Sequence, residues 1–272
     1  SDIYAGGDLF FQTKKRDGNA LFNIEIGSDG TSRTELKADL KYLTFSYLTL
    51  SNRAGLKQEY FEESHYNWYN DFGNYFVTDL KIEPYYKSKK VYATAFYQLQ
   101  TYKNYVYYDT LYDSFAPVQD KGTRIANYYG GQIQVKLKKW KFGEYLQVAS
   151  LEDIKFIAVP RIYSQTNLDY NFRVKWLPAL KTNLGVDAIY FSKYSPLAYR
   201  SDLQSFVAQY GFEEEGYLKL DAYVNFRYKT VQVSLKGINL LQGLISEGYY
   251  PTEGYFGKKR GFELGIKWRF FR

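Results

Sequence analysis

The stretch at residues 167–176 reads NLDYNFRVKW and decides the fold class of the chain. Every second residue in it is apolar, and these residues are Leu168, Tyr170, Phe172, Val174 and Trp176. The residues between them are all polar or charged, namely Asn167, Asp169, Asn171, Arg173 and Lys175. Successive side chains of a β-strand point to opposite faces of a sheet. The alternation therefore predicts a strand with one apolar face and one polar face.

The same pattern recurs along the chain. It is clearest at residues 132–138, 218–228 and 262–270, where apolar and polar residues again take turns. No segment shows a comparably clear helical periodicity. We therefore expect an all-β chain.

The connections between these strands alternate between tight turns and long polar loops. The tight turns are expected at residues 29–30, 88–89, 138–140, 178–179 and 228–229. The long loops are expected at residues 53–71, 103–122, 151–158, 194–215 and 242–259. Short turns at one end and long loops at the other are typical of outer-membrane barrels. One connection does not fit, because residues 16–19 form a short turn where a long loop is expected.

The number of strands depends on a phase slip at Tyr42 and Leu43. If the slip is a β-bulge, the chain has about 12 strands, and if it is a turn, about 14. Either count predicts a transmembrane antiparallel up-and-down β-barrel, with residues 1–272 as a single barrel domain.

A soluble β-sandwich with the apolar face inside is the alternative architecture. Two features favour the membrane. The polar face carries Asn, Gln, Tyr, Gly and charges of both signs, and the apolar stripes have aromatic residues near their ends. Trp and Tyr prefer the headgroup level of a bilayer. We expect such membrane-interface positions for Tyr170, Trp176, Tyr228, Trp268 and Phe270.

Composition excludes several classes of site. The chain has 272 residues with 31 Tyr, 20 Phe and 4 Trp, but no Cys and one His. Disulfides, thiolate metal sites and Cys nucleophiles are therefore absent, and we expect no cofactor, no metal and no enzymatic activity. A hydrolase at the barrel rim would have to use His65, which we interpret as a polar loop residue. The chain also lacks Met, so we expect a processed or truncated product whose export signal is gone.

The last predicted strand carries a signal of its own. Outer-membrane barrels often end in an alternating aromatic strand that the barrel-assembly machinery reads during insertion. Five residues form such a row here: Phe262, Leu264, Ile266, Trp268 and Phe270. We therefore expect the barrel-assembly machinery and outer-membrane lipids as partners, with integral insertion in the outer membrane of a Gram-negative bacterium.

Basic clusters such as residues 138–141 fall in short turns, so we expect no nucleic-acid partner.

Four segments of the C-terminal half carry a family resemblance: VPRIYSQTNL at 159–168, DAIYFSKY at 187–194, GYYP at 248–251 and WRFF at 268–271. Together they resemble the C-terminal part of the "putative porin" family of Bacteroidota, over roughly the last 120 residues. The resemblance implies an outer-membrane β-barrel with a porin role. Members of that family usually have longer barrels, so the chain could be the C-terminal portion of one.

The charged residues on the polar face are the candidates for a lumen lining. They are Asp169, Arg173, Lys175, Asp187, Lys219, Asp221, Arg227, Lys236, Glu263, Lys267 and Arg269. They could line a water-filled passage that slightly favours anions, or they could pair with one another and plug a narrow barrel. We expect a passive channel for small hydrophilic solutes.

The alternative function is a structural or accessory barrel that docks a secretion, assembly or surface-lipoprotein complex through its long loops. Aromatic residues of two loops would then be the interface anchors: Tyr60, Phe61, Tyr66, Trp68, Tyr69, Tyr249, Tyr250, Tyr255 and Phe256. Their other interpretation is that the loops fold on their own aromatic residues. Homo-oligomerisation also stays open.

Overall fold

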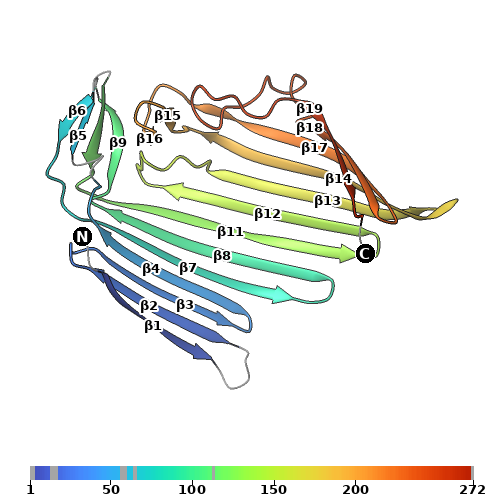
Figure 1. Cartoon of the computed structure of the whole chain (residues 1–272), viewed down its shortest axis with the longest axis horizontal. Coiled ribbons are helices and arrows are strands. Elements are labelled where there is room, and N and C mark those ends of the chain that lie inside the picture. Colours follow the sequence, from blue (N-terminus) through green and yellow to red (C-terminus); the bar gives the residue numbers. More distant parts are fainter. Residues whose placement is uncertain (1–3, 13–17, 56–59, 64–65, 112–113, 271–272) are drawn as a thin grey trace.

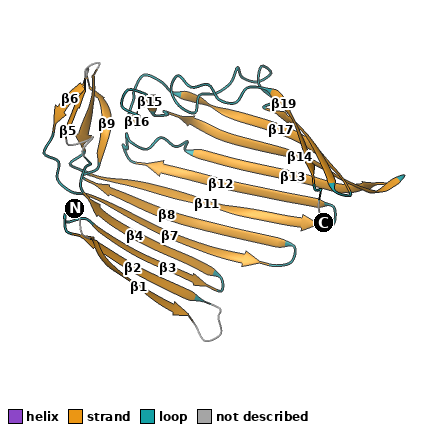
Figure 2. Ribbon diagram, in the orientation of Figure 1, coloured by secondary structure: helices purple, strands orange, loops and turns teal. Residues whose placement is uncertain are grey.

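The computed structural model describes residues 4–12, 18–55, 60–63, 66–111 and 114–270. His65 and Phe271 lie outside the described residues, and of Tyr60, Phe61 and Tyr66 only the backbone is described. Figure 2 shows a molecule made of strands and loops. No helix in the described part is both long and apolar enough to cross a bilayer.

In the part of the chain that the structure describes, thirteen antiparallel strands follow one another in a single curved sheet (Figure 1). In sheet order they are β1 (Tyr4–Gln12), β2 (Asn19–Gly27), β3 (Ser32–Leu40), β4 (Leu43–Asn52), β7 (Tyr75–Lys87), β8 (Val91–Lys103), β11 (Thr123–Leu137), β12 (Trp140–Leu151), β13 (Ile162–Val174), β14 (Leu177–Tyr194), β17 (Glu214–Tyr228), β18 (Val231–Ile238) and β19 (Gly261–Trp268). Each strand pairs with the strands that precede and follow it in this order, which is the expected up-and-down connectivity.

The long connections carry three small hairpins. They are formed by β5 (Tyr60–Glu63) with β6 (Tyr66–Tyr69), β9 (Val106–Leu111) with β10 (Ser114–Gln119), and β15 (Ala198–Arg200) with β16 (Ser205–Val207). All three stand at the same end of the large sheet (Figure 1). We call this end the loop end and the opposite one the turn end.

The number of strands in the described sheet lies within the predicted range of about 12 to 14. The phase slip at Tyr42 and Leu43 is a turn, because Leu40 pairs with Leu43 across residues 41–42. Because this turn adds one more crossing of the sheet, β1 ends and β2 begins at the turn end, where a short connection is expected. The short connection at the loop end is instead the turn between β2 and β3 at residues 28–31.

The turn between β13 and β14 also differs from the prediction. It consists of Lys175 and Trp176, with Val174 paired to Leu177, and not of residues 178–179. Pro178 follows directly after the first residue of β14, and a proline is tolerated near the start of a strand because few ladder hydrogen bonds are lost there. Lys175 and Trp176 therefore lie in a turn and not on the two faces of a strand.

The sheet has a polar face and an apolar face. On the apolar face large side chains are open to the surroundings: Phe262 is 79% exposed, Leu264 68% and Ile266 69%. Such a continuous exposed apolar surface is typical of a protein that contacts a membrane or another protein. The two-faced strands predicted from the alternation are confirmed. The sheet is not closed, because β1 and β19 form opposite edges and do not pair with each other in the described part (Figure 1).

Buried apolar clusters are small and lie near the loop end. One consists of Ala126, Tyr128 and Ala149 on the polar side of β11 and β12. Ile154, Ile157 and Val159 of the loop after β12 pack against it. This loop is therefore anchored over the polar face.

Candidate functional site: the polar face of the sheet

Strand pairing brings nine of the predicted lumen residues onto the polar face. They are Asp169, Arg173, Asp187, Lys219, Asp221, Arg227, Lys236, Glu263 and Lys267. Lys175 is in the turn described above, and Arg269 follows the end of β19, where its backbone N–H donates to the carbonyl of Thr230 at 3.1 Å. Five strands, β13, β14, β17, β18 and β19, thus contribute these residues to one continuous polar surface.

The middle of this surface is built around Tyr223 of β17. Its ring lies across Gly185 of β14, since a Cβ added at Gly185 would come within 2.1 Å of the ring. Only a residue without a side chain leaves that space. The Tyr223 hydroxyl thereby reaches over β14 and donates to the Asp169 carboxylate of β13 at 2.8 Å. One side chain connects three strands.

Amide side chains extend the network in both directions. Asn167 Nδ2 donates to Asp187 Oδ1 at 2.6 Å, and Asn183 Nδ2 donates to Asp169 Oδ1 at 2.8 Å. Asn225 Nδ2 donates to Asn183 Oδ1 at 3.1 Å. Asp169 accepts from an amide and a phenol, whereas Asp187 Oδ2 also lies 3.4 Å from the Nζ of Lys236, so this zone consists of carboxylates and amides with an ion pair to β18.

Asp221 of β17 is the most deeply buried carboxylate of the face, at 4% exposure. Lys219 and Lys236 each place their Nζ 3.0 Å from its Oδ2. Its Oδ1 accepts from the backbone N–H of Asn239 at 2.8 Å, and Asn239 is itself fully buried with a positive φ of 51°. Asp221 therefore stabilises the end of β18 as well as the two lysines. We call Asn167, Asp169, Asn183, Asp187, Asp221 and Tyr223 the carboxylate–amide belt.

Basic side chains are grouped toward the turn end of the same face. Arg173 pairs in register with Lys181, and Lys181 pairs with Arg227. Arg227 is followed across Gln232 by Lys267. All four cations are exposed, and no carboxylate in the described part of the chain forms an ion pair with them. We call Arg173, Lys181, Arg227 and Lys267 the basic row.

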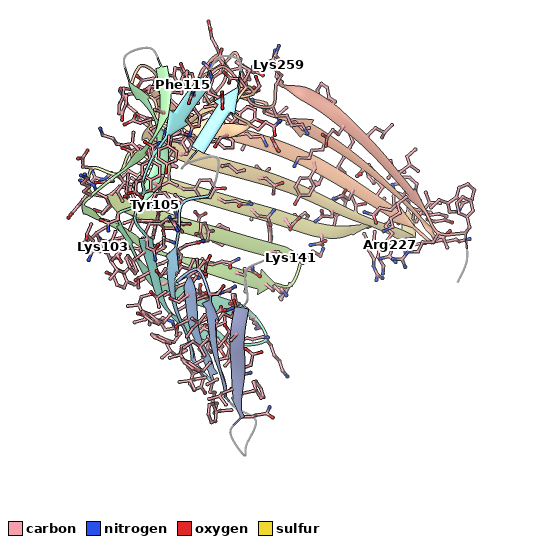
Figure 3. The ribbon with its side chains drawn as sticks, turned by 60° about the vertical axis from the view of Figure 1, so that its left-hand side comes forward. Lys103, Tyr105, Phe115, Lys141, Arg227 and Lys259 are labelled. Atoms are coloured by element: carbon pink, nitrogen blue, oxygen red, sulfur yellow. The ribbon has the colours of Figure 1, made fainter. Side chains whose placement is uncertain are left out.

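The basic row and the long loops lie at opposite ends of the molecule. Figure 3 shows Arg227 and Lys141 at the turn end and Lys103 and Tyr105 at the loop end. A solute that moves along the polar face would therefore pass first the loops, then the carboxylate–amide belt and then the basic row.

Charged side chains on the polar face of β3 and β7 have partners within the sheet. Asp79 accepts from Gln98 at 2.9 Å and from Gln100 at 2.9 Å. Glu35 forms ion pairs with Arg33 at 3.0 Å and with Lys37. Lys136 of β11 and Lys141 of β12, on the same face, form no ion pair with a carboxylate in the described part either, so the unpaired positive charge extends from β11 to β19.

The apolar face contains one carboxylate that the sequence analysis missed. Glu144 of β12 pairs in register with Ile133 and Thr166, which places its side chain on the apolar face. Ser164 Oγ and Thr166 Oγ1 donate to it at 2.6 and 2.5 Å. Glu144 is the only charged side chain on this face that is not the first or last residue of its strand, among the residues that the structure describes.

The aromatic residues expected at a membrane interface cluster at the turn end. Tyr170 contacts Trp140 with ring centroids 4.5 Å apart, and Trp268 stacks on Phe270 at 4.7 Å. Trp176 in the turn is 82% exposed. Trp140, which the sequence analysis assigned to a turn, is the first residue of β12 and belongs to the same group. The interface and insertion roles themselves stay predictions.

Several of the loop aromatics pack on their own chain. Trp68 contacts Tyr108 at 5.9 Å, Tyr249 contacts Tyr217 at 4.8 Å, and Tyr250 contacts Phe256 at 5.1 Å. Tyr69 is 81% exposed. Among the described residues, no group of three or more His, Asp or Glu side chains is arranged to hold a metal ion.

Comparison with solved structures shows the fold. The copper transporter OprC has a TM-score of 0.67 at 12% identity, over 99% of this chain and 47% of that one. The FrpB iron transporter from Neisseria meningitidis in its apoprotein form has 0.65 at 12%, over 98% and 45%. The pyoverdine outer membrane receptor FpvA from Pseudomonas aeruginosa PAO1 has 0.60 at 15%, over 99% and 42%. The chain thus spans less than half the length of these barrel proteins, and no curated protein sequence matches it.

Comparison with protein families covers the whole chain. A family described as "Putative porin" matches residues 1–272, well beyond the last 120 or so residues in which the resemblance was visible. Together with the fold shared with outer-membrane neighbours, the match points to an outer-membrane location and to a transport-related protein. On the strength of the family match along its entire length, the chain belongs to this porin family.

Proposed function

We propose that the chain forms the wall of a channel through which small hydrophilic solutes diffuse passively across the outer membrane of a Gram-negative bacterium. The polar face would line the water, and the apolar face would contact lipid as an integral membrane surface. Hydrocarbon provides no hydrogen-bond partner for an open strand edge. The edges of β1 and β19 would therefore be paired in the membrane, with each other or with further strands.

The observation that carries this proposal is the hydrogen-bonded polar face, which continues across five strands opposite an exposed apolar face. In a soluble sandwich the apolar face would be covered by a second sheet. An apolar face against lipid needs no such cover. No chemistry is required of the face, since its side chains replace part of the hydration shell of the solute while the concentration gradient drives the flux.

The basic row would set the preference among solutes. Uncompensated positive charges at a constriction raise the local concentration of anions. We therefore propose that neutral polar solutes and small anions pass more readily than cations.

Single-channel recording in planar bilayers under a salt gradient tests both statements. The purified protein should produce current steps with a reversal potential that indicates anion preference. Replacing the basic row cations Lys181, Arg227 and Lys267 by Gln should lower the anion-to-cation permeability ratio at least about two-fold while current persists. Lys89→Gln, in a turn at the same end, is the matched control. A protein that inserts into the bilayer but passes no current would overturn the channel proposal.

A second candidate function is docking of a partner protein at the loop end. Leu244 and Ile245 in the loop between β18 and β19 are 74% and 66% exposed, and such exposed apolar side chains outside the sheet favour a protein contact. A complex of constant stoichiometry that is lost in Leu244→Ser/Ile245→Ser would support docking. A barrel that purifies alone, with or without self-association, would support the channel alone.

A further inference from the structure

A cavity of about 560 Å³ lies at the loop end, away from both the carboxylate–amide belt and the basic row. One wall is the loop after β12, and the other is formed by the end of β14 and the segment that follows β16. Figure 1 shows these segments next to each other at the loop end of β12–β14. The volume falls within the range of pockets that bind small organic molecules.

Both walls are held in place by contacts with their own chain. Phe156, in the first wall, stacks on Tyr105 with ring centroids 4.4 Å apart. In the second wall, Gln209 Nε2 donates to the carbonyls of Pro196 at 2.6 Å and Phe212 at 2.8 Å. Pro196 is fully buried. A cavity whose walls are already ordered binds its ligand with a small entropic cost.

Tyr210 ties the second wall to a hairpin on another loop. Its hydroxyl donates to Asp109 Oδ1 of β9 at 2.7 Å, and Asp109 is 6% exposed. The Lys155 Nζ lies 5.0 Å from the centroid of the Tyr210 ring, so the cation of the first wall faces the ring of the second. The two walls therefore meet at a pair that combines an aromatic surface with a positive charge.

The lining combines an apolar surface with uncompensated positive charge. Its apolar part includes Ile154, Ile157, Val159 and Leu197. Of its three cations, Lys193 is neutralised by Glu213 at 2.7 Å. Lys155 and Arg161 form no ion pair with any carboxylate in the part of the chain that the structure describes.

We propose that this cavity binds small organic anions that have an apolar body, such as arylalkyl or medium-chain carboxylates. The apolar wall takes the body of the ligand, and Lys155 and Arg161 take the carboxylate. The site deepens the proposed function and rests on it, because a solute retained at the loop end is concentrated next to the channel entrance. It adds a solute class that the basic row alone does not select.

The test is isothermal titration of the detergent-solubilised full chain with 4-phenylbutyrate, with protein-free micelles as the blank. One saturable site is expected. Acetate, which lacks the apolar body, and 4-phenylbutylamine, which carries the opposite charge, should each bind at least tenfold more weakly. Equal binding of the amine and the carboxylate would overturn the proposal.

Two variants locate the site. Lys155→Gln/Arg161→Gln and Ile157→Asn should each weaken 4-phenylbutyrate binding at least tenfold. Lys121→Gln, an exposed loop-end cation that does not line the cavity, should leave binding unchanged. Retained heat-modifiable gel mobility checks that each variant is folded. Unchanged affinity in both cavity variants would overturn the proposal even if binding itself is real.

Measurements of binding and of conductance distinguish a failure of the cavity proposal from a failure of the channel proposal. A protein that conducts but binds no 4-phenylbutyrate overturns the cavity site and keeps the channel. A protein that binds it in the expected order and passes no current keeps the site as a ligand-binding pocket and overturns the channel.

Discussion

Asp221 and Glu144 are carboxylates on the two opposite faces of one sheet, and their surroundings differ in kind. Asp221, on the polar face, contacts two lysine Nζ atoms at 3.0 Å and a backbone N–H at 2.8 Å. Glu144, on the apolar face, has two hydroxyl donors and no cation. A charge is stable where donors and opposite charges surround it, and costly where the neighbours are apolar.

The comparison distinguishes a charge that holds several strands together from a charge that the sheet only tolerates. The partners of Asp221 come from β17, β18 and the residue after β18, so its charge connects elements. The partners of Glu144 both belong to β13, so its two hydrogen bonds only reduce the cost of its position. Glu144 is four residues from Trp140, which at a strand tilt of about 45° corresponds to roughly 9 Å of depth into the apolar band.

The largest effect is expected for Asp221→Leu. It leaves Lys219 and the buried Asn239 N–H without their acceptor and Lys236 with only Asp187 at 3.4 Å, which we expect to destabilise the fold by about 3–5 kcal/mol. Urea titration followed by the gel shift of the folded barrel measures this. Asp221→Asn, which retains an acceptor, should cost clearly less. A variant as stable as the parent chain would contradict the assignment of Asp221 as a connecting charge.

The next largest effect concerns the space under Tyr223. In Gly185→Ala the new Cβ lies 2.1 Å from the ring, so Tyr223 must move and its hydrogen bond to Asp169 is lost. We expect a loss of about 1–3 kcal/mol in the same urea titration. Gly143→Ala is the matched control, because a Cβ at Gly143 meets nothing closer than 3.9 Å. Equal stability of the two alanine variants would show that Tyr223 does not lie across Gly185.

A smaller effect of opposite sign is expected on the apolar face. Glu144→Leu replaces a carboxylate by an apolar side chain, and the hydroxyls of Ser164 and Thr166 can turn to backbone carbonyls. In lipid vesicles we expect a gain in stability of about 1 kcal/mol. A loss comparable to that of Asp221→Leu would mean that Glu144 faces water or a partner and not lipid.

The smallest effect is local and depends on pH. Burial, together with the hydrogen bond to Asp109, raises the pKa of the Tyr210 phenol above its ordinary value of 10.0. Since the folded state favours the protonated phenol, its stabilising contact is fully present below about pH 10 and is lost as the pH rises through the folded-state value. Limited proteolysis should therefore cut the loop at residues 208–213 faster at pH 11 than at pH 9. In Tyr210→Phe the pH dependence should disappear, leaving faster cleavage at both pH values.

The sequence alone was sufficient for the two faces of the strands. The alternation in residues 167–174 and 262–268 determines which side chains share a face, because the period of a strand is two wherever the strand pairs. The exact positions of the turns could not be predicted from the sequence, since Lys175 and Trp176 continue the alternating pattern into a turn. The strand count could be given only as about 12 to about 14 for the same kind of reason at residues 41–42, where a tight turn and a bulge look alike in sequence.

The contacts within the polar face were decided by the tertiary structure. Tyr223 and Asp169 are 54 positions apart, and their hydrogen bond requires the register of two strand pairs and the missing side chain of Gly185. Glu144 is in phase with Phe142 and Leu146 of its own strand, but only the pairing of β12 with β13 brings the hydroxyls of Ser164 and Thr166 to it. Local sequence determines the face that a residue occupies within its strand, whereas the register between strands determines which residues it meets there, and register is set by the whole sheet.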